Sequence, residues 1–153
     1  MKQHPGLLAG GMIVFAIFAC NTSNNRNANT NTNAGPTRSA NAEVYVDSIH
    51  MAKDNSGEAG ASTTTFSPDE RTVHVVINLN KAKAGTQVKV VWIAADVEGA
   101  KDKELKTLDY TTTAFDKTIP GYLKWSQDWP RGSYKCDVYI NGALDKSISY
   151  TIE

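Results

Sequence analysis

The sequence predicts an all-β fold, a sandwich of antiparallel strands. Apolar and polar residues alternate along several segments, as they do on a strand with one buried face. Asn141-Gly142 separates two of these segments, and this pair predicts a tight hairpin because both turn positions require positive φ. After Ala42 no segment shows a sustained helical period. These three observations argue against a helical or mixed domain.

The strands are expected in order along the chain. The alternation is clearest at residues 73–79, 134–140 and 144–152, and weaker strands fit residues 44–51, 104–112 and 119–125. In the last clear segment the even-numbered residues from Leu144 are expected to be buried. Residues 88–94 are apolar on both faces, which predicts a central strand, and the charged stretch 96–104 is interpreted as a solvated loop. The total is about seven strands in about 110 residues.

The N-terminal segment has the parts of a secretory signal. Lys2 supplies positive charge, and an apolar run from Gly6 to Ala19 ends at Cys20. The run is shorter than the roughly 20 apolar residues that span a bilayer, which disfavours an uncleaved transmembrane anchor. Ile17-Phe18-Ala19-Cys20 resembles the lipobox of bacterial lipoproteins, although Phe18 is bulkier than usual there. The resemblance implies cleavage before Cys20 and its lipidation by acyl chains such as palmitate.

The same resemblance places the protein in the bacterial cell envelope, attached to a membrane through its N-terminal lipid. In that family an aspartate after the cysteine often marks retention at the inner membrane. Asn21 stands there instead, which favours the outer membrane, at its periplasmic or surface face. The segment that follows is rich in Asn and Thr and has almost no large apolar side chain, so we expect a disordered linker. The predicted organisation is a signal helix at 1–19, a linker at 20–42 and one domain at 43–153.

Two details of the domain resemble the immunoglobulin superfamily. Trp92 lies on the strand where such sandwiches bury a tryptophan. Tyr134 stands two residues before Cys136 at the start of the penultimate strand, as in the tyrosine corner of that superfamily, which implies a hydroxyl bonded to backbone near Asp128 to Pro130. No cysteine lies on the 73–79 strand, so Cys136 is expected to be a buried free thiol. The implied fold is a single immunoglobulin-like β-sandwich.

Composition narrows the chemistry. The formal net charge is zero and lysines and acids are interspersed, which argues against nucleic-acid binding. His50 and His74 have no second ligand at metal spacing, so no metal or cofactor is predicted and His74 is interpreted as an exposed strand residue. There is no Gly-x-Ser-x-Gly elbow and no phosphate-binding glycine loop. The sequence therefore predicts a protein that is not an enzyme. The alternative that stays open is a hydrolase in which strands bring two distant carboxylates together.

One aromatic cluster, Tyr122, Trp125 and Trp129, is the candidate ligand surface. Aromatic faces stack on sugars and on flat apolar partners. Core packing is the competing interpretation, because Trp125 alternates in phase with Leu123 and Trp129 can close the end of the sandwich. We expect a non-catalytic binding or assembly module with a protein partner in the envelope. The alternative is an accessory domain that binds carbohydrate or a small ligand through exposed aromatics, and an envelope hydrolase comes third.

Overall fold

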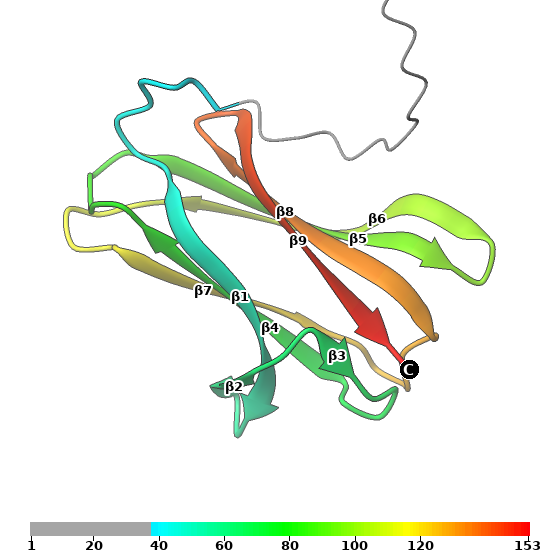
Figure 1. Ribbon diagram of the computed structural model, residues 1–153. Coiled ribbons are helices and arrows are strands. Elements are labelled where there is room, and N and C mark those ends of the chain that lie inside the picture. Colours follow the sequence, from blue (N-terminus) through cyan, green and yellow to red (C-terminus); the bar gives the residue numbers. More distant parts are fainter. Residues whose placement is uncertain (1–37) are drawn as a thin grey trace, which may run out of the picture. The chain divides into compact units, whose positions relative to one another are not determined.

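The computed structural model describes residues 38–153, so the expected signal helix, Cys20 and most of the expected linker lie outside the described residues. The described part contains no helix, and its nine strands form two sheets (Figure 1). One sheet has the order β2-β1-β4-β7, formed by Glu58–Ser62, Val46–Asn55, Thr72–Leu79 and Thr118–Lys124. The other has the order β3-β9-β8-β5-β6, formed by Thr65–Phe66, Ala143–Ile152, Gly132–Ile140, Gln87–Val97 and Ala100–Thr111.

The strand count differs from the predicted seven because β2 and β3 are too short and too polar to give an alternating pattern. The charged stretch 96–104 is also not a loop. β5 and β6 are paired along their whole length, from Gln87 opposite Thr111 to Val97 opposite Ala100. The turn between them is closed by Glu98 and Gly99, which both have positive φ. The stretch is therefore the tip of a β-hairpin, whose exposed positions carry the charges.

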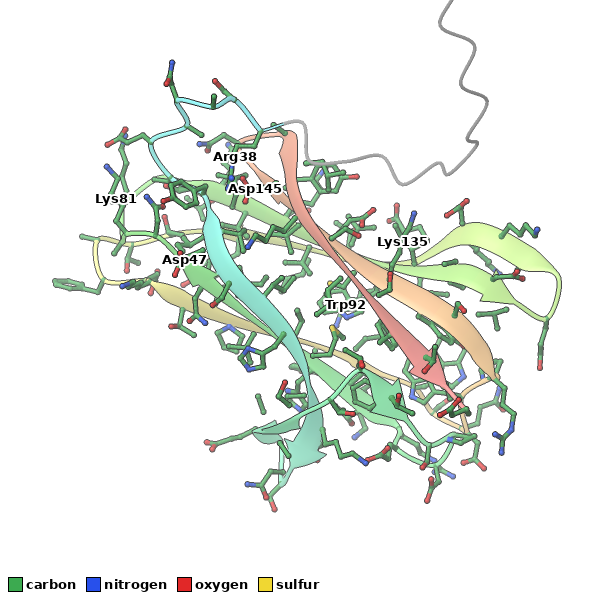
Figure 2. All side chains as sticks on the ribbon, viewed as in Figure 1. Arg38, Asp47, Lys81, Trp92, Lys135 and Asp145 are labelled. Atoms are coloured by element: carbon green, nitrogen blue, oxygen red, sulfur yellow. The ribbon has the colours of Figure 1, made fainter. Side chains whose placement is uncertain are left out.

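The core lies between the sheets and is centred on Trp92 of β5, which is fully buried (Figure 2). Cys136 of β8 is its neighbour across the ladder, and the thiol is free and buried, as predicted. Burial raises the pKa of this thiol. The indole reaches the opposite sheet at Gly121 of β7, where an added Cβ would lie 3.1 Å from Cη2 of Trp92. The absence of a side chain at Gly121 thus lets the two sheets approach closely around the tryptophan.

An aromatic group fills the end of the core where β8 begins. The rings of Tyr134 and Tyr150 stack at 5.4 Å, and Phe66 meets Tyr150 edge-on at 5.6 Å. The Tyr134 hydroxyl donates a hydrogen bond to the Pro130 carbonyl oxygen at 2.7 Å, within the range indicated by the sequence. Burial raises the pKa of Tyr134 to about 12. This bond pins the crossover that enters β8.

Asp145 of β9 is a buried charge that the alternation did not predict. A register shift between Val138 and Tyr139 changes the phase of β9 against β8, so that Asp145 is buried next to Leu144. Its Oδ2 accepts the backbone N–H of Val46 at 2.7 Å. The guanidinium of Arg38 lies 3.3 Å from its Oδ1. The buried carboxylate is thereby compensated and holds the first described residue against the domain.

Candidate binding site

The structure does not bring the three predicted aromatics into one surface. Tyr122 is 53% exposed on the outer face of β7, beside the His74 ring at 5.9 Å. Trp125 and Trp129 lie past the end of β7, where their rings stack at 5.1 Å. Trp129 is buried in the core, and Trp125 is partly buried against it. The arrangement matches core packing for the two tryptophans and leaves Tyr122 alone.

The tryptophans are placed by backbone hydrogen bonds to the segment before β4. Trp125 N–H donates to the Arg71 carbonyl at 2.8 Å, and Trp129 N–H donates to the Pro68 carbonyl at 2.8 Å. Together with Tyr134 and the β5–β6 hairpin they line a hollow of about 210 Å³. That is below the roughly 300 Å³ at which pockets for drug-sized ligands begin. The hollow has room for little more than one apolar side chain.

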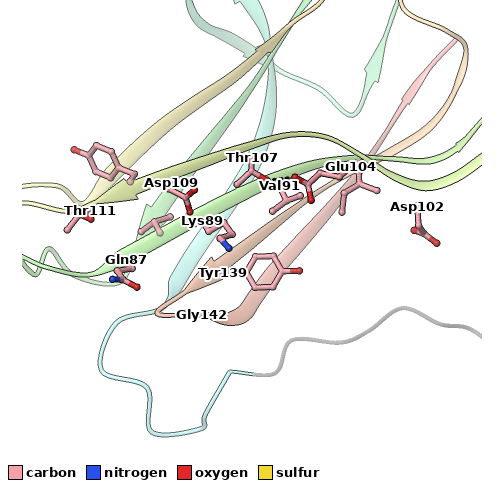
Figure 3. Close-up of a pocket in the computed structure, with 13 residues that line it drawn as sticks. Gln87, Lys89, Val91, Asp102, Glu104, Thr107, Asp109, Thr111, Tyr139 and Gly142 are labelled. Atoms are coloured by element: carbon pink, nitrogen blue, oxygen red, sulfur yellow. Dashed lines mark hydrogen bonds between the residues drawn. The ribbon is translucent and has the colours of Figure 1, made fainter.

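A concavity of about 870 Å³ lies on the outer face of the five-stranded sheet, and we call it the outer groove (Figure 3). Its floor is formed by the β5 side chains that point away from the core. Val91 and Ile93 form the apolar part of this floor, and Val91 is only 7% exposed. The complete lining is Gln87, Val88, Lys89, Val91, Ile93, Asp102, Glu104, Thr107, Asp109, Tyr110, Thr111, Tyr139 and Gly142. The inner face of β5 is therefore buried in the core, while on its outer face Val91 is buried, Ile93 is partly buried and Lys89 is exposed.

The walls of the outer groove are polar, and acidic residues outnumber basic ones in them. Lys89 lies between Asp109 of β6 and Tyr139 of β8 in the ladder, and Ile93 lies opposite Glu104. The lining holds three carboxylates, those of Asp102, Glu104 and Asp109, and a single cation, Lys89. The groove thus combines an apolar floor with an acidic wall along β6.

The acidic wall is ordered by hydrogen bonds and an ion pair. Thr107 Oγ1 donates to Glu104 Oε1 at 2.7 Å. Lys135 Nζ lies 3.0 Å from Asp102 Oδ1, and this contact raises the pKa of Lys135. The sequence did not predict the groove, because it does not show which strand pairs with β5 on this side. The apolar outer residues Val91 and Ile93 were the available signal, and they were interpreted only as a mark of a central strand.

His74 is buried, contrary to the expectation of an exposed strand residue. The β1–β2 hairpin brings Asp54 over it, and Tyr122 covers it from β7. His74 Nε2 lies 2.7 Å from Asp54 Oδ1, and the hydrogen bond holds the Asp54 pKa below its usual range. Ser56 and Thr72 line the same hollow, but the structure shows no hydrogen bond from His74 to either hydroxyl within the described residues. The pair joins β1 to β4 and lacks the linked nucleophile of a hydrolase.

The described residues are 38–153. Among them, no three or more His, Cys, Asp or Glu side chains are grouped so as to hold a metal ion. In the same residues there is no helix of the length and hydropathy needed to cross a membrane.

No protein-family model matches the chain, and no curated protein matches it. Among solved structures it is similar to an immunoglobulin-like protein from Pseudomonas aeruginosa, at 15% identity and a TM-score of 0.53, over 75% of this chain and 100% of that one. Weaker similarities are to an alkylpurine DNA glycosylase from Pseudomonas fluorescens (12% identity, TM-score 0.44) and a β-glucosidase from Listeria innocua (11%, 0.44). The similarity covers 73% of this chain and 31% of the DNA glycosylase, and 72% of this chain and 16% of the β-glucosidase. The similarity to the immunoglobulin-like protein from Pseudomonas aeruginosa shows an immunoglobulin-like fold.

Proposed function

We propose that this protein is a lipid-anchored, non-catalytic binding module of the bacterial cell envelope that holds a protein partner in the outer groove. Cys20 is the proposed site of acylation, on the strength of the lipobox resemblance. The observation that carries the binding role is the groove itself, with its apolar floor of Val91 and Ile93 inside a polar wall. An apolar centre surrounded by a polar rim is the usual anatomy of a protein interface.

The two tryptophans of the predicted aromatic cluster do not offer a carbohydrate-binding face, and the groove suits a polypeptide. Sugar-binding faces present flat, exposed aromatic rings, whereas Trp129 is buried and Trp125 is partly buried. A polypeptide segment can place an apolar side chain on the floor beside Ile93. Basic side chains of the same segment can then meet the carboxylates along β6. The expected partner surface is therefore apolar at its centre and basic at one edge.

Site-specific photocrosslinking from the full-length chain in its own envelope tests this proposal. A photoreactive phenylalanine replaces Tyr139, which lines the groove, or Tyr122, which is exposed on the other sheet. We expect a discrete protein adduct from position 139 and none from position 122. The adduct should disappear when Ile93→Lys places a charge on the groove floor. An adduct of the same size from both positions, or none from 139, contradicts binding in the groove.

A further inference from the structure

Phe115 is the most exposed large apolar side chain of the described residues, at 91%. It lies in the connection between β6 and β7, and hydrogen bonds hold that connection in shape. The Asp116 carboxylate accepts the backbone N–H of Thr113 at 2.6 Å and the Tyr110 hydroxyl at 2.8 Å. Lys117 N–H donates to the Phe115 carbonyl at 3.0 Å. The loop is thus ordered without any packing by the ring, which is presented to solvent.

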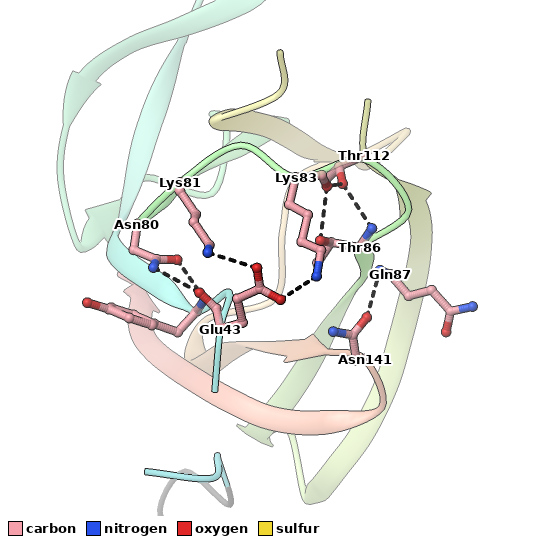
Figure 4. A network of polar contacts seen from close by, with 9 residues as sticks. Glu43, Asn80, Lys81, Lys83, Thr86, Gln87, Thr112 and Asn141 are labelled. Carbon is pink, nitrogen blue, oxygen red and sulfur yellow. Dashed lines mark hydrogen bonds and ion pairs between the residues drawn. The ribbon is translucent and has the colours of Figure 1, made fainter. Parts of the chain in front are cut away.

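The connection is joined to its neighbours in one polar network (Figure 4). Thr112 forms two backbone hydrogen bonds with the β4–β5 connection. Its N–H donates to the Thr86 carbonyl at 3.0 Å, and its carbonyl accepts the Gly85 N–H at 2.8 Å. Glu43 forms ion pairs with Lys81, at 2.9 Å, and with Lys83. We call this end of the domain the tether end, and it comprises residues 38–45, 80–86, 112–117 and 141–142.

The chain toward Cys20 leaves the domain from the tether end. Arg38 is fixed there by its ion pair with Asp145 and lies over the Tyr45 ring, 4.6 Å from the centroid. A flexible segment the length of residues 21–37 has a root-mean-square reach of about 23 Å. A lipid on Cys20 would therefore keep the tether end close to the membrane surface, whereas the β5–β6 hairpin lies at the other end of the strands and is not held there.

Charge at the tether end suits lipid headgroups. Its exposed cations are Arg38, Lys81, Lys83 and Lys117, and its exposed or half-exposed carboxylates are those of Glu43 and Asp116. Both carboxylates already accept hydrogen bonds from the protein, whereas the lysine ammonium groups have further N–H donors available for phosphate oxygens. Phenylalanine is among the apolar side chains that membrane-surface segments bury at the boundary between headgroups and acyl chains.

We propose that the tether end docks on the lipid surface, with Phe115 in the interfacial layer and the surrounding lysines at headgroup phosphates. The proposal rests on the proposed lipid anchor, because one aromatic side chain is too small a contact to hold a protein on a bilayer without it. Tethering makes the contact intramolecular, so a weak contact is populated. Docking would point the far end of the outer groove away from the membrane, toward a partner in the surrounding space.

The test supplies the anchor chemically. The chain from Cys20 onward contains the whole described domain, and its Cys20 thiol can be coupled to a maleimide lipid because Cys136 is buried. The vesicles contain zwitterionic and anionic lipids with brominated acyl chains, which quench indole fluorescence. Phe115→Trp is the reporter, and Tyr122→Trp is the matched control, because Tyr122 is also exposed but lies on the middle of β7.

We expect F115W emission to shift to shorter wavelength and lose intensity on coupling, relative to coupled wild type, while Y122W emission stays unchanged. Unquenched F115W in coupled protein overturns docking, and so does equal quenching of both variants, which means no preferred orientation. If F115W responds to an envelope protein and not to lipid, the surface is a protein contact and the proposal is wrong. Acylation is tested separately by palmitate labelling in cells, and its failure leaves the coupled experiment interpretable.

Discussion

Removal of one hydroxyl at the Tyr134 corner should weaken the fold measurably. The hydroxyl donates to the Pro130 carbonyl at 2.7 Å, and Tyr134 is buried. Tyr134→Phe keeps the ring and its stacking but leaves the carbonyl of the partly buried Pro130 without this donor, which costs about 1 to 3 kcal/mol. For a domain of this size each kcal/mol corresponds to roughly 4 °C, so the melting temperature should fall by about 4 to 12 °C.

Tyr150 is the matched control for this substitution. Its ring stacks on Tyr134, but its buried hydroxyl has no hydrogen-bond partner within residues 38–153. Tyr150→Phe therefore removes an oxygen that is already desolvated and unpaired, and should leave stability unchanged or raise it. Urea unfolding of both variants beside the wild type measures the difference. If the two phenylalanine variants change the free energy of unfolding equally, the corner bond contributes nothing and the reasoning fails.

Three other results are expected. Gly121→Ala places a Cβ 3.1 Å from the Trp92 ring and should cost about 1 to 3 kcal/mol in urea unfolding by overpacking, and no loss would mean that the sheets have room to spare. Hydrogen bonding from Lys83 lowers the Glu43 pKa from 4.5 to about 2, so this carboxylate stabilises the fold above about pH 4.5 and its contribution is lost as the pH falls toward 2. The stability difference between wild type and Glu43→Gln should shrink across that window, and a pH-independent difference refutes the pair. Cys20→Ser should abolish palmitate labelling and membrane association, whereas retained labelling would disprove the anchor.

Much of the fold could be predicted because its signals are local. Alternation located seven strands, since a strand with one buried face repeats every two residues. The features that were missed depend on tertiary contacts. The burial of Asp145 follows from a register shift between β8 and β9, and the burial of His74 from coverage by Asp54 and Tyr122. A single sequence does not reveal a register shift, nor which hairpin will fold over an outer face.

The candidate site was harder to predict for a related reason. Large aromatic residues indicate a candidate ligand surface, but they are also the residues that fill a small core. The outer groove is built from ordinary residues, and its concavity arises only when β6 pairs with β5. That pairing depends on Glu98, a non-glycine residue with positive φ, which propensity does not identify as a turn. The fold and its free thiol followed from pattern, whereas the groove did not.

The sheet edges bear on how a partner can bind. Pro120 lies on the edge strand β7 and has no N–H to offer an added strand. On the edge strand β6, Lys106 turns inward, donates to the Tyr122 carbonyl at 3.1 Å and lies 5.8 Å from the centre of the Trp92 ring. An inward-pointing lysine at an edge opposes pairing with another chain, because pairing would bury its charge. These features of β6 and β7 argue against strand addition at the two edges and in favour of binding on a face of a sheet.

Lys106→Val should therefore open the β6 edge. The variant loses the bond to Tyr122 and gains a β-branched apolar residue on an unpaired strand, so we expect concentration-dependent association by size-exclusion chromatography with light scattering. Lys101→Val is the control, because Lys101 is exposed near the hairpin turn of the same strand and the substitution removes the same charge. It should remain monomeric. If both variants associate, loss of net charge is the cause, and if neither does, Lys106 is not what protects this edge.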